Sequence, residues 1–254
     1  ELDYFVADAK PHVLVCRPES LDTFTEIAAD HNVAHTLSLG LEEGGTLVDA
    51  MDRVPDGDGA VEVRGLDDIA AILYTSGTTG FPKGVVRSHG FLRNQVDRVH
   101  HLGTTEADVI YNYLPLFHIF GYLDGPMLSM ATGNRQILTA TFDAEACLDA
   151  VEAEGVTQFS GFETHVKGLV EAQLRKPRDL SSLRTGVFGA GTFSAVPIMQ
   201  QALEVLAPMI PISAYGMTEI GGNACLSFLD STAEQMCETS GHPCPGFDFR
   251  VINP

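Results

Sequence analysis

The stretch that organises this chain reads Tyr74-Thr75-Ser76-Gly77-Thr78-Thr79-Gly80-Phe81-Pro82-Lys83-Gly84. It combines three glycines, four serine or threonine hydroxyls and one lysine. Glycines let the backbone approach a ligand closely, and successive backbone N–H groups in such a turn form a concave site for an anion. The hydroxyls and the Lys83 ammonium add further donors. This composition predicts a loop that grips phosphate, in preference to a plain flexible surface loop.

The loop differs from the P-loop of the common nucleotide hydrolases. That motif requires Gly, four residues and then Gly-Lys-Ser/Thr, whereas Pro82 stands at the second glycine position and Gly84 replaces the final hydroxyl. The apolar run at residues 69–73 predicts a buried strand. Residues 84–87 predict a short strand, after which Ser88 is a candidate helix N-cap. We therefore expect the order strand, loop, strand, helix, with no helix N-terminus directly on the loop.

Charge and composition narrow the classes of function. The chain has 254 residues and a formal net charge of −19, from 34 acidic against 15 basic residues. Such a field repels nucleic acid and anionic membranes, so we expect neither as a partner. No apolar run reaches the length of about 18 residues that indicates a transmembrane helix. The five cysteines are scattered without motif spacing, which fits a reducing compartment and predicts a cytoplasmic protein.

The chain alternates between strand-like and helix-like runs. Residues 1–66 form an opening unit with a strand at 13–16 and helices at 19–30 and 46–53, and residues 67–254 form the main unit. After the loop, strands are predicted at residues 109–114, 135–140, 156–161, 185–189 and 210–214. Helices are predicted at residues 90–102, 119–131, 143–154, 163–174 and 194–206. The alternation favours an α/β fold of mainly parallel sheets covered by helices, with ligands bound beyond the carboxyl ends of the strands.

Two of these strand ends carry side chains that admit two interpretations. His118 follows the strand at 109–114 and lies between aromatic neighbours, where it is either a core histidine or part of a substrate channel. Gly189, Ala190 and Gly191 end the strand at 185–189. Such small residues either let a flat ring approach the backbone or form a tight turn.

A third strand end brings three chemical groups together. After residues 210–214, Tyr215 offers a ring for stacking, Thr218 a hydroxyl and Glu219 a carboxylate. A glutamate after a strand is often a helix-start residue or a surface charge. Because Mg²⁺ binds through one or two carboxylates together with substrate phosphates, a metal site beside the phosphate loop is the favoured interpretation.

In order and spacing, residues 74–84, 114–118, 189–191, 215–219 and 241–246 resemble five motifs of the adenylate-forming enzymes. That superfamily includes acyl-CoA synthetases, firefly-type luciferases and the adenylation domains of peptide synthetases. The resemblance implies the α/β N-terminal domain of these enzymes and a two-step reaction. A carboxylate attacks the α-phosphate of ATP, and a thiol, usually that of coenzyme A, then takes the acyl group from the acyl-adenylate. Residues 156–165 resemble the fatty-acyl members, which implies a fatty acid substrate.

The resemblance also implies roles for individual residues. The β- and γ-phosphates of ATP would be held by Thr75, Ser76, Gly77, Thr78, Thr79, Gly80 and Lys83. The adenosine and α-phosphate would be bound by Gly189, Ala190, Gly191, Ala214, Tyr215, Gly216, Met217 and Thr218. The acid would be bordered by His118, Phe162, Gly189 and Gly221. The catalytic residues would be Thr218, Lys83 and Glu219, with Glu219 as the ligand of Mg²⁺.

Two parts of the family pattern are missing from the sequence. The ribose-binding aspartate of a Thr-Gly-Asp motif and the mobile C-terminal domain with its catalytic lysine would follow Pro254. We therefore expect a fragment of a longer protein, with little activity alone. The expected partners are a carboxylic acid, ATP and coenzyme A, and a homodimer is allowed. Two alternatives stay open, namely adenylation with a carrier protein or another acceptor, and a truncated nucleotide-binding protein that does not catalyse.

Overall fold

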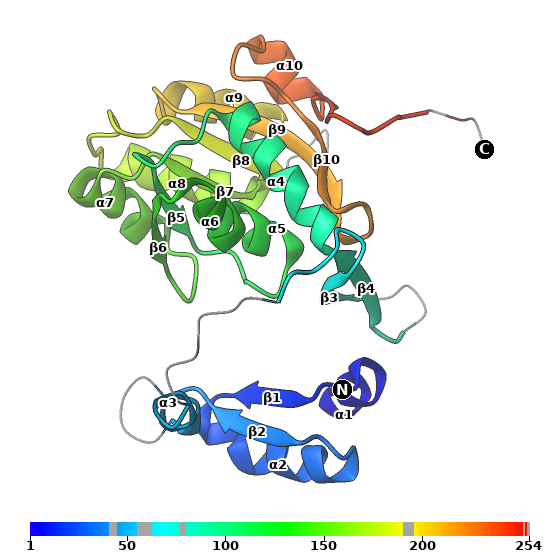
Figure 1. Cartoon of the computed structure of the whole chain (residues 1–254). Coiled ribbons are helices and arrows are strands. Elements are labelled where there is room, and N and C mark those ends of the chain that lie inside the picture. Colours follow the sequence, from blue (N-terminus) through cyan, green and yellow to red (C-terminus); the bar gives the residue numbers. More distant parts are fainter. Residues whose placement is uncertain (41–44, 55–61, 77–79, 190–195, 251, 253–254) are drawn as a thin grey trace. The chain divides into compact units, whose positions relative to one another are not determined.

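The computed structural model describes residues 1–40, 45–54, 62–76, 80–189, 196–250 and 252. The chain divides into two compact units, Glu1–Arg64 and Gly65–Pro254 (Figure 1). Five predicted site residues lie outside the described residues, namely Gly77, Thr78, Thr79, Ala190 and Gly191. Within the described part of the chain, no helix has the length and apolar character needed to cross a membrane.

The first unit is a small α/β element. Helix α1 (Leu2–Ala9) precedes strand β1 (Val13–Cys16), and a 3₁₀ turn leads into α2 (Leu21–Asp30). Strand β2 (His35–Ser38) returns parallel to β1, and α3 (Thr46–Asp52) follows. The predicted strand and both predicted helices are confirmed. The sequence does not predict β2, because its four residues hold only one large apolar side chain and no clear alternation.

The second unit opens with a hairpin. Strands β3 (Ile69–Thr75) and β4 (Lys83–Ser88) pair antiparallel, and α4 (His89–Leu102) follows directly. The predicted order of strand, loop, strand and helix is therefore confirmed. The prediction that the first strand is buried is wrong, because Ile69 and Ile72 are 63% and 40% exposed. In the described residues these two strands form a sheet of their own, so neither is covered as a strand of the larger sheet is.

The main sheet of the described residues has seven strands, in the order β11-β10-β9-β8-β7-β5-β6. Its parallel strands are β5 (Val109–Asn112), β6 (Arg135–Leu138), β7 (Gln158–Phe162), β8 (Thr185–Gly189) and β9 (Ile210–Met217). All five were predicted from the sequence as strands. The antiparallel additions at one edge are β10 (Gly222–Leu226) and β11 (His242–Pro243).

Helices cover both faces of this sheet (Figure 1). One face carries α7 (Ala144–Glu154), α8 (Glu163–Arg175) and α9 (Val196–Val205), and α10 (Ala233–Glu238) packs against α9. The other carries α4 and α6 (Leu128–Thr132). The chain moves one way along the sheet from β5 to β6 and the other way from β6 through β7 and β8 to β9. Because each crossover is right-handed, the helices of these two parts lie on opposite faces of the sheet. The core between the layers includes the fully buried Phe159 and Phe188.

The helix predicted at residues 119–131 is interrupted. The structure has α5 (Ile119–Tyr122), a π-helical turn over Leu123–Met127 and only then α6. Gly125 has φ −98° and ψ −108°, outside helical values, and Pro126 lacks the N–H that a regular helix would use. The interruption matters for the site because the π-helical turn contains a buried carboxylate, Asp124.

Candidate functional site

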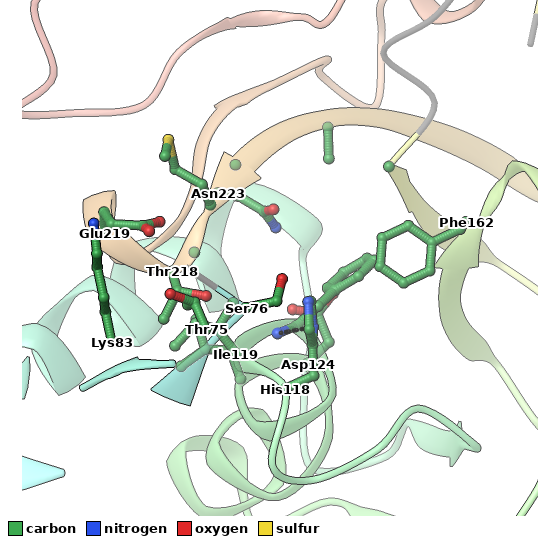
Figure 2. A pocket seen from close by; sticks show the side chains of 17 residues that line it. Thr75, Ser76, Lys83, His118, Ile119, Asp124, Phe162, Thr218, Glu219 and Asn223 are labelled. Carbon is green, nitrogen blue, oxygen red and sulfur yellow. Dashed lines mark hydrogen bonds between the residues drawn. The ribbon is translucent and has the colours of Figure 1, made fainter. Parts of the chain in front are cut away.

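A cavity of about 420 Å³ lies at the carboxyl ends of β7, β8 and β9, and the β3–β4 hairpin and the segment after β5 complete its wall (Figure 2). The predicted site residues in its lining are Thr75, Ser76, Lys83, His118, Phe162, Gly189, Ala214, Gly216, Met217, Thr218 and Glu219. The topology explains why such distant residues meet, because parallel strands present their carboxyl ends at one edge of a sheet.

One end of the cavity suits a phosphate chain. Lys83 stands directly opposite Thr75 in the hairpin, so both side chains project to the same side. Figure 2 shows Lys83 and Glu219 together at this end, with Thr75 and Thr218 next to them. The end thus offers a cation, two hydroxyls and a carboxylate, which complement phosphate oxygens and a bound metal ion.

Thr218 and Glu219 lie on a 3₁₀ turn between β9 and β10. The turn depends on close approach of the two strands, because a Cβ atom on Gly216 would lie 2.0 Å from the carbonyl oxygen of Gly222. Thr218 is buried, whereas Glu219 is exposed and lines the cavity.

Sequence reasoning missed Arg87 of β4. Its guanidinium donates a hydrogen bond to the backbone carbonyl of Thr218, and its Cζ atom lies 5.6 Å from the centre of the Phe91 ring. Burial lowers the pKa of Arg87, and the Glu219 carboxylate acts in the opposite direction. Arg87 therefore ties the hairpin to the turn that carries Glu219. The sequence gives no signal for this contact, because the partner is 131 residues away.

Glu219 has the chemistry of a Mg²⁺ ligand. Mg²⁺ at nucleotide sites is held by one or two carboxylates together with substrate phosphates and water. Glu219 is an exposed carboxylate at the Lys83 end of the cavity. Within the described ranges, no group of three or more His, Cys, Asp or Glu side chains could hold a metal ion. The residues present therefore fit a metal ion that arrives with a phosphate-bearing substrate.

His118 lies at the start of α5, where its Nδ1 accepts the backbone N–H of Phe120 at 3.2 Å. Its ring meets the Phe162 ring edge-on, with the ring centroids 5.9 Å apart. Partial burial lowers the pKa of His118 below its usual value of 6.5, which favours the neutral imidazole. His118 keeps part of its surface open and lines the cavity. His118 is therefore not a core histidine.

Three described residues that the sequence assigned to the site do not line this cavity. Tyr215 is 43% exposed, and its ring lies edge-on to Phe249 with the centroids 6.4 Å apart. Gly221 borders a separate cavity of about 30 Å³. Gly80 lies in the segment between β3 and β4 with φ +91°, a conformation that favours glycine.

Sequence reasoning also missed part of the cavity lining, namely Ile119, Phe120, Leu123, Asp124, Gly222 and Asn223. Ile119, Phe120 and Leu123 fit the pattern of an ordinary core helix, so the sequence does not indicate that they line a site. The available signal was Asp124, a lone acid in an apolar run.

Comparison with known proteins finds a family and several relatives. The family model described as AMP-binding enzyme matches residues 1–254. A 3-[(3aS,4S,7aS)-7a-methyl-1,5-dioxo-octahydro-1H-inden-4-yl]propanoyl:CoA ligase of Mycobacterium tuberculosis is 35% identical over 189 residues, covering 73% of this chain and 37% of that protein. The medium-chain fatty-acid–CoA ligase of Escherichia coli is 31% identical, covering 74% of this chain and 32% of that protein. A feruloyl-CoA synthase of an Amycolatopsis species is 31% identical, covering 100% of this chain and 49% of that protein.

Among solved structures, ATP-bound MatB from Rhodopseudomonas palustris matches with a TM-score of 0.84 at 29% identity. The match covers 97% of this chain and 47% of that chain. The predicted fold, a sheet of mostly parallel strands flanked by helices, is thereby confirmed. The chain spans between 32% and 49% of the length of the three curated relatives named above.

Proposed function

The chain belongs to the AMP-binding enzyme family, and from this membership we propose that the protein activates a carboxylic acid with ATP. An oxygen of the acid attacks the α-phosphorus, the bond to the leaving pyrophosphate breaks, and an acyl-adenylate forms. The sulfur of coenzyme A then attacks the acyl carbon, and AMP leaves. The relatives support this proposal, because those named above are CoA ligases or a CoA synthase.

The observation that carries the proposal is the composition of the 420 Å³ cavity. Lys83, Thr75 and Ser76 provide a positive charge and hydroxyls for the β- and γ-phosphates. Thr218 would contact the α-phosphate, and Glu219 would hold Mg²⁺. The metal would neutralise phosphate charge when bound. Transfer of this kind needs positioning and charge neutralisation more than covalent work by the protein.

We assign the nucleoside to the ends of β8 and β9. Gly189, Ala214 and Gly216 have little or no side chain and line the cavity, so a flat purine can lie close to the backbone there. Tyr215 is assigned to stack on the base, and its exposed ring is accessible for that role.

The acid is assigned to the other side of the cavity, near His118 and Phe162 (Figure 2). Ile119, Phe120 and Leu123 also contribute to the lining there. We propose a fatty or similarly apolar acid, because these walls are mainly hydrocarbon and would desolvate an apolar chain. The location is proposed as cytoplasmic, because all five cysteines are free thiols.

Acid-dependent exchange of pyrophosphate into ATP by the full-length protein tests the first step, with octanoate as the initial acid. Lys83→Met should reduce the exchange strongly. The matched control is Lys167→Met, because Lys167 forms an exposed ion pair with Glu171. A protein that binds ATP but shows no exchange with any acid would be a non-catalytic nucleotide-binding protein.

The acceptor is tested separately with the same acid. Coenzyme A and a phosphopantetheinylated carrier protein are offered in parallel, and the thioester is measured. A thioester on coenzyme A supports the proposed reaction. Acylation of the carrier alone would change the acceptor and leave the adenylation step intact.

A further inference from the structure

A buried ion pair lies behind the apolar wall of the cavity. Arg98 of α4 and Asp124 of the π-helical turn are 5% and 3% exposed, and the Arg98 guanidinium donates to Oδ2 of Asp124. The hydroxyl of Ser160, in β7, donates to the same oxygen at 2.8 Å. Two elements, α4 and β7, thus supply donors to one oxygen of the Asp124 carboxylate, next to the apolar lining residues Ile119, Phe120 and Leu123.

The other carboxylate oxygen lacks a donor. Asp124 Oδ1 is buried and has no hydrogen-bond partner among the described residues. A buried acceptor without a donor is costly, and burial raises the pKa of Asp124 despite the Arg98 guanidinium beside it. A donor supplied by a ligand would remove this penalty.

A second polar group accompanies Asp124 in the lining. With its side-chain oxygen turned toward Arg98, Asn223 accepts from the guanidinium, at 2.8 Å from Nη2. The Asn223 amide N–H groups then point away from Arg98. Asp124 and Asn223 both line the cavity, whereas Arg98 lines the smaller cavity beyond them. Figure 2 shows Asp124 beside His118, on the side of the cavity away from Lys83 and Glu219.

We propose that Asp124 and Asn223 select an acid whose otherwise apolar acyl portion bears a neutral hydrogen-bonding group, a hydroxyl above all. The hydroxyl donates to Asp124 Oδ1 and accepts from the Asn223 amide. A neutral group is favoured over an ammonium because Arg98 already balances the charge of Asp124. This inference rests on the proposed acid activation and narrows its substrate class from an apolar acid to a hydroxylated one.

The test is pyrophosphate exchange by the full-length protein with octanoate and with the hydroxyoctanoates substituted at each carbon from C2 to C8. A second pair, 3-(4-hydroxyphenyl)propanoate and 3-(4-methylphenyl)propanoate, offers nearly equal shapes with and without the hydroxyl. At least one hydroxy acid should exceed its partner in kcat/KM by about tenfold or more, because a site built around buried polar groups rejects the analogue that leaves them unpaired.

Two variants assign the preference to Asp124. Asp124→Asn keeps the shape, and Arg98 draws the amide oxygen toward itself, so an N–H replaces the unpaired acceptor. The preference should then move toward the oxo acid that corresponds to the favoured hydroxy acid. The triple variant Arg98→Met, Asp124→Leu, Ser160→Ala removes the network, and such replacement of buried ion pairs by apolar residues is often tolerated. It should favour octanoate.

A matched control is the double variant Asp108→Leu, Arg184→Met. It removes an ion pair at 3.0 Å in which Asp108 is 6% and Arg184 36% exposed by side chain, and neither residue lines the cavity. The hydroxyl preference should survive in this variant.

The outcomes separate the two proposals. If octanoate is used at least as well as every hydroxy acid, the selectivity inference is overturned and acid activation stands. If the preference persists in the triple variant, Asp124 is not its source and the inference is equally overturned. If no acid supports exchange, the proposed function fails and the inference falls with it.

Discussion

At the scale of single residues, the two cavity-lining carboxylates differ in their partners and their exposure. Asp124 is paired with Arg98, whereas Glu219 lies exposed near Lys83. Glu219→Gln should therefore raise the Mg²⁺ concentration for half-maximal pyrophosphate exchange by roughly tenfold or more, since even outer-shell partners of metal ligands are worth about 10- to 100-fold. Mg²⁺ titration of the exchange rate provides the measurement. Glu204→Gln, an exposed change on α9, is the control. An unaltered titration curve would remove Glu219 from the metal role.

Arg87 is expected to act by positioning the turn that carries Glu219. Its hydrogen bond to the Thr218 carbonyl involves a charged donor, and such bonds contribute about 1.5–3 kcal/mol. Arg87→Met should lower kcat/KM for MgATP by roughly tenfold, and Arg87→Lys should recover part of the loss. Arg135→Met, which removes an exposed ion pair with Glu154, should leave kcat/KM unchanged. Equal loss in the Lys and Met variants would argue against a role for the charged donor.

At the scale of elements, β9 and β10 hold the Thr218–Glu219 turn only if Gly216 has no side chain. A Cβ atom there would lie 2.0 Å from a backbone oxygen that cannot move freely. Gly216→Ala should lower the free energy of unfolding by about 3 kcal/mol, measured by urea denaturation, and weaken nucleotide binding. Gly65→Ala is the control, because a Cβ atom there would approach Asp68 no closer than 3.6 Å.

The histidines at the starts of α5 and α8 make these helix ends sensitive to pH. His118 Nδ1 accepts from the Phe120 N–H, and His165 Nδ1 accepts from the Phe162 N–H. Burial lowers the pKa of both histidines below 6.5. Protonation is therefore easier in the unfolded chain, so their stabilisation is complete above about pH 6.5 and is lost as the pH falls toward the lowered folded pKa values.

Melting temperatures measured between pH 7.5 and pH 5 check this prediction. His165→Gln should make the melting temperature fall less steeply as the pH is lowered, because one of the two histidines with a lowered pKa is gone. His100→Gln, an exposed change on α4, is the matched control. A slope that is the same in all three proteins would exclude a contribution from His165.

Helices and strands were easier to predict from the sequence than their burial and tertiary contacts. Strands β5 to β9 were predictable from apolar runs, and the helices between them from apolar residues at helical spacing, which are local properties of the sequence. The exposure of β3 depends on which strands lie beside it, which the sequence does not show. The break at Gly125 has a local cause, because Gly125 and Pro126 stand inside an otherwise apolar helix pattern. Lys83 was predicted from the composition of its loop and Glu219 from its position after a strand, whereas the contacts of Arg87 and Asp124 join segments that only the tertiary fold brings together.

At the scale of the whole molecule, the charge of −19 opposes the approach of a polyanionic nucleotide. Raising the ionic strength from about 0.02 M to about 0.2 M shortens the screening length to below about 10 Å. The KM for MgATP should fall by roughly two- to threefold over this range, while the KM for the singly charged acid changes less. Steady-state kinetics in sodium chloride measure both. A KM for MgATP that rises with salt would show that local cations dominate the approach.

The length of the chain relative to its relatives carries another expectation. It spans 49% or less of the curated relatives named above, and we propose that the 254 residues alone adenylate poorly. Pyrophosphate exchange by the 254-residue chain should be a small fraction of that of the full-length protein, while retaining measurable nucleotide binding. Equal exchange rates in the two would contradict this proposal.

The hydrogen bond from Arg87 to Thr218 closes a segment of 131 residues. A contact between residues so far apart in the chain carries the entropy cost of closing the segment between them. Nucleotide affinity therefore depends on correct folding of the whole segment between the hairpin and this turn. Damage anywhere between the hairpin and the turn, even in a helix far from the cavity, should register as weakened nucleotide binding before the sheet itself is lost.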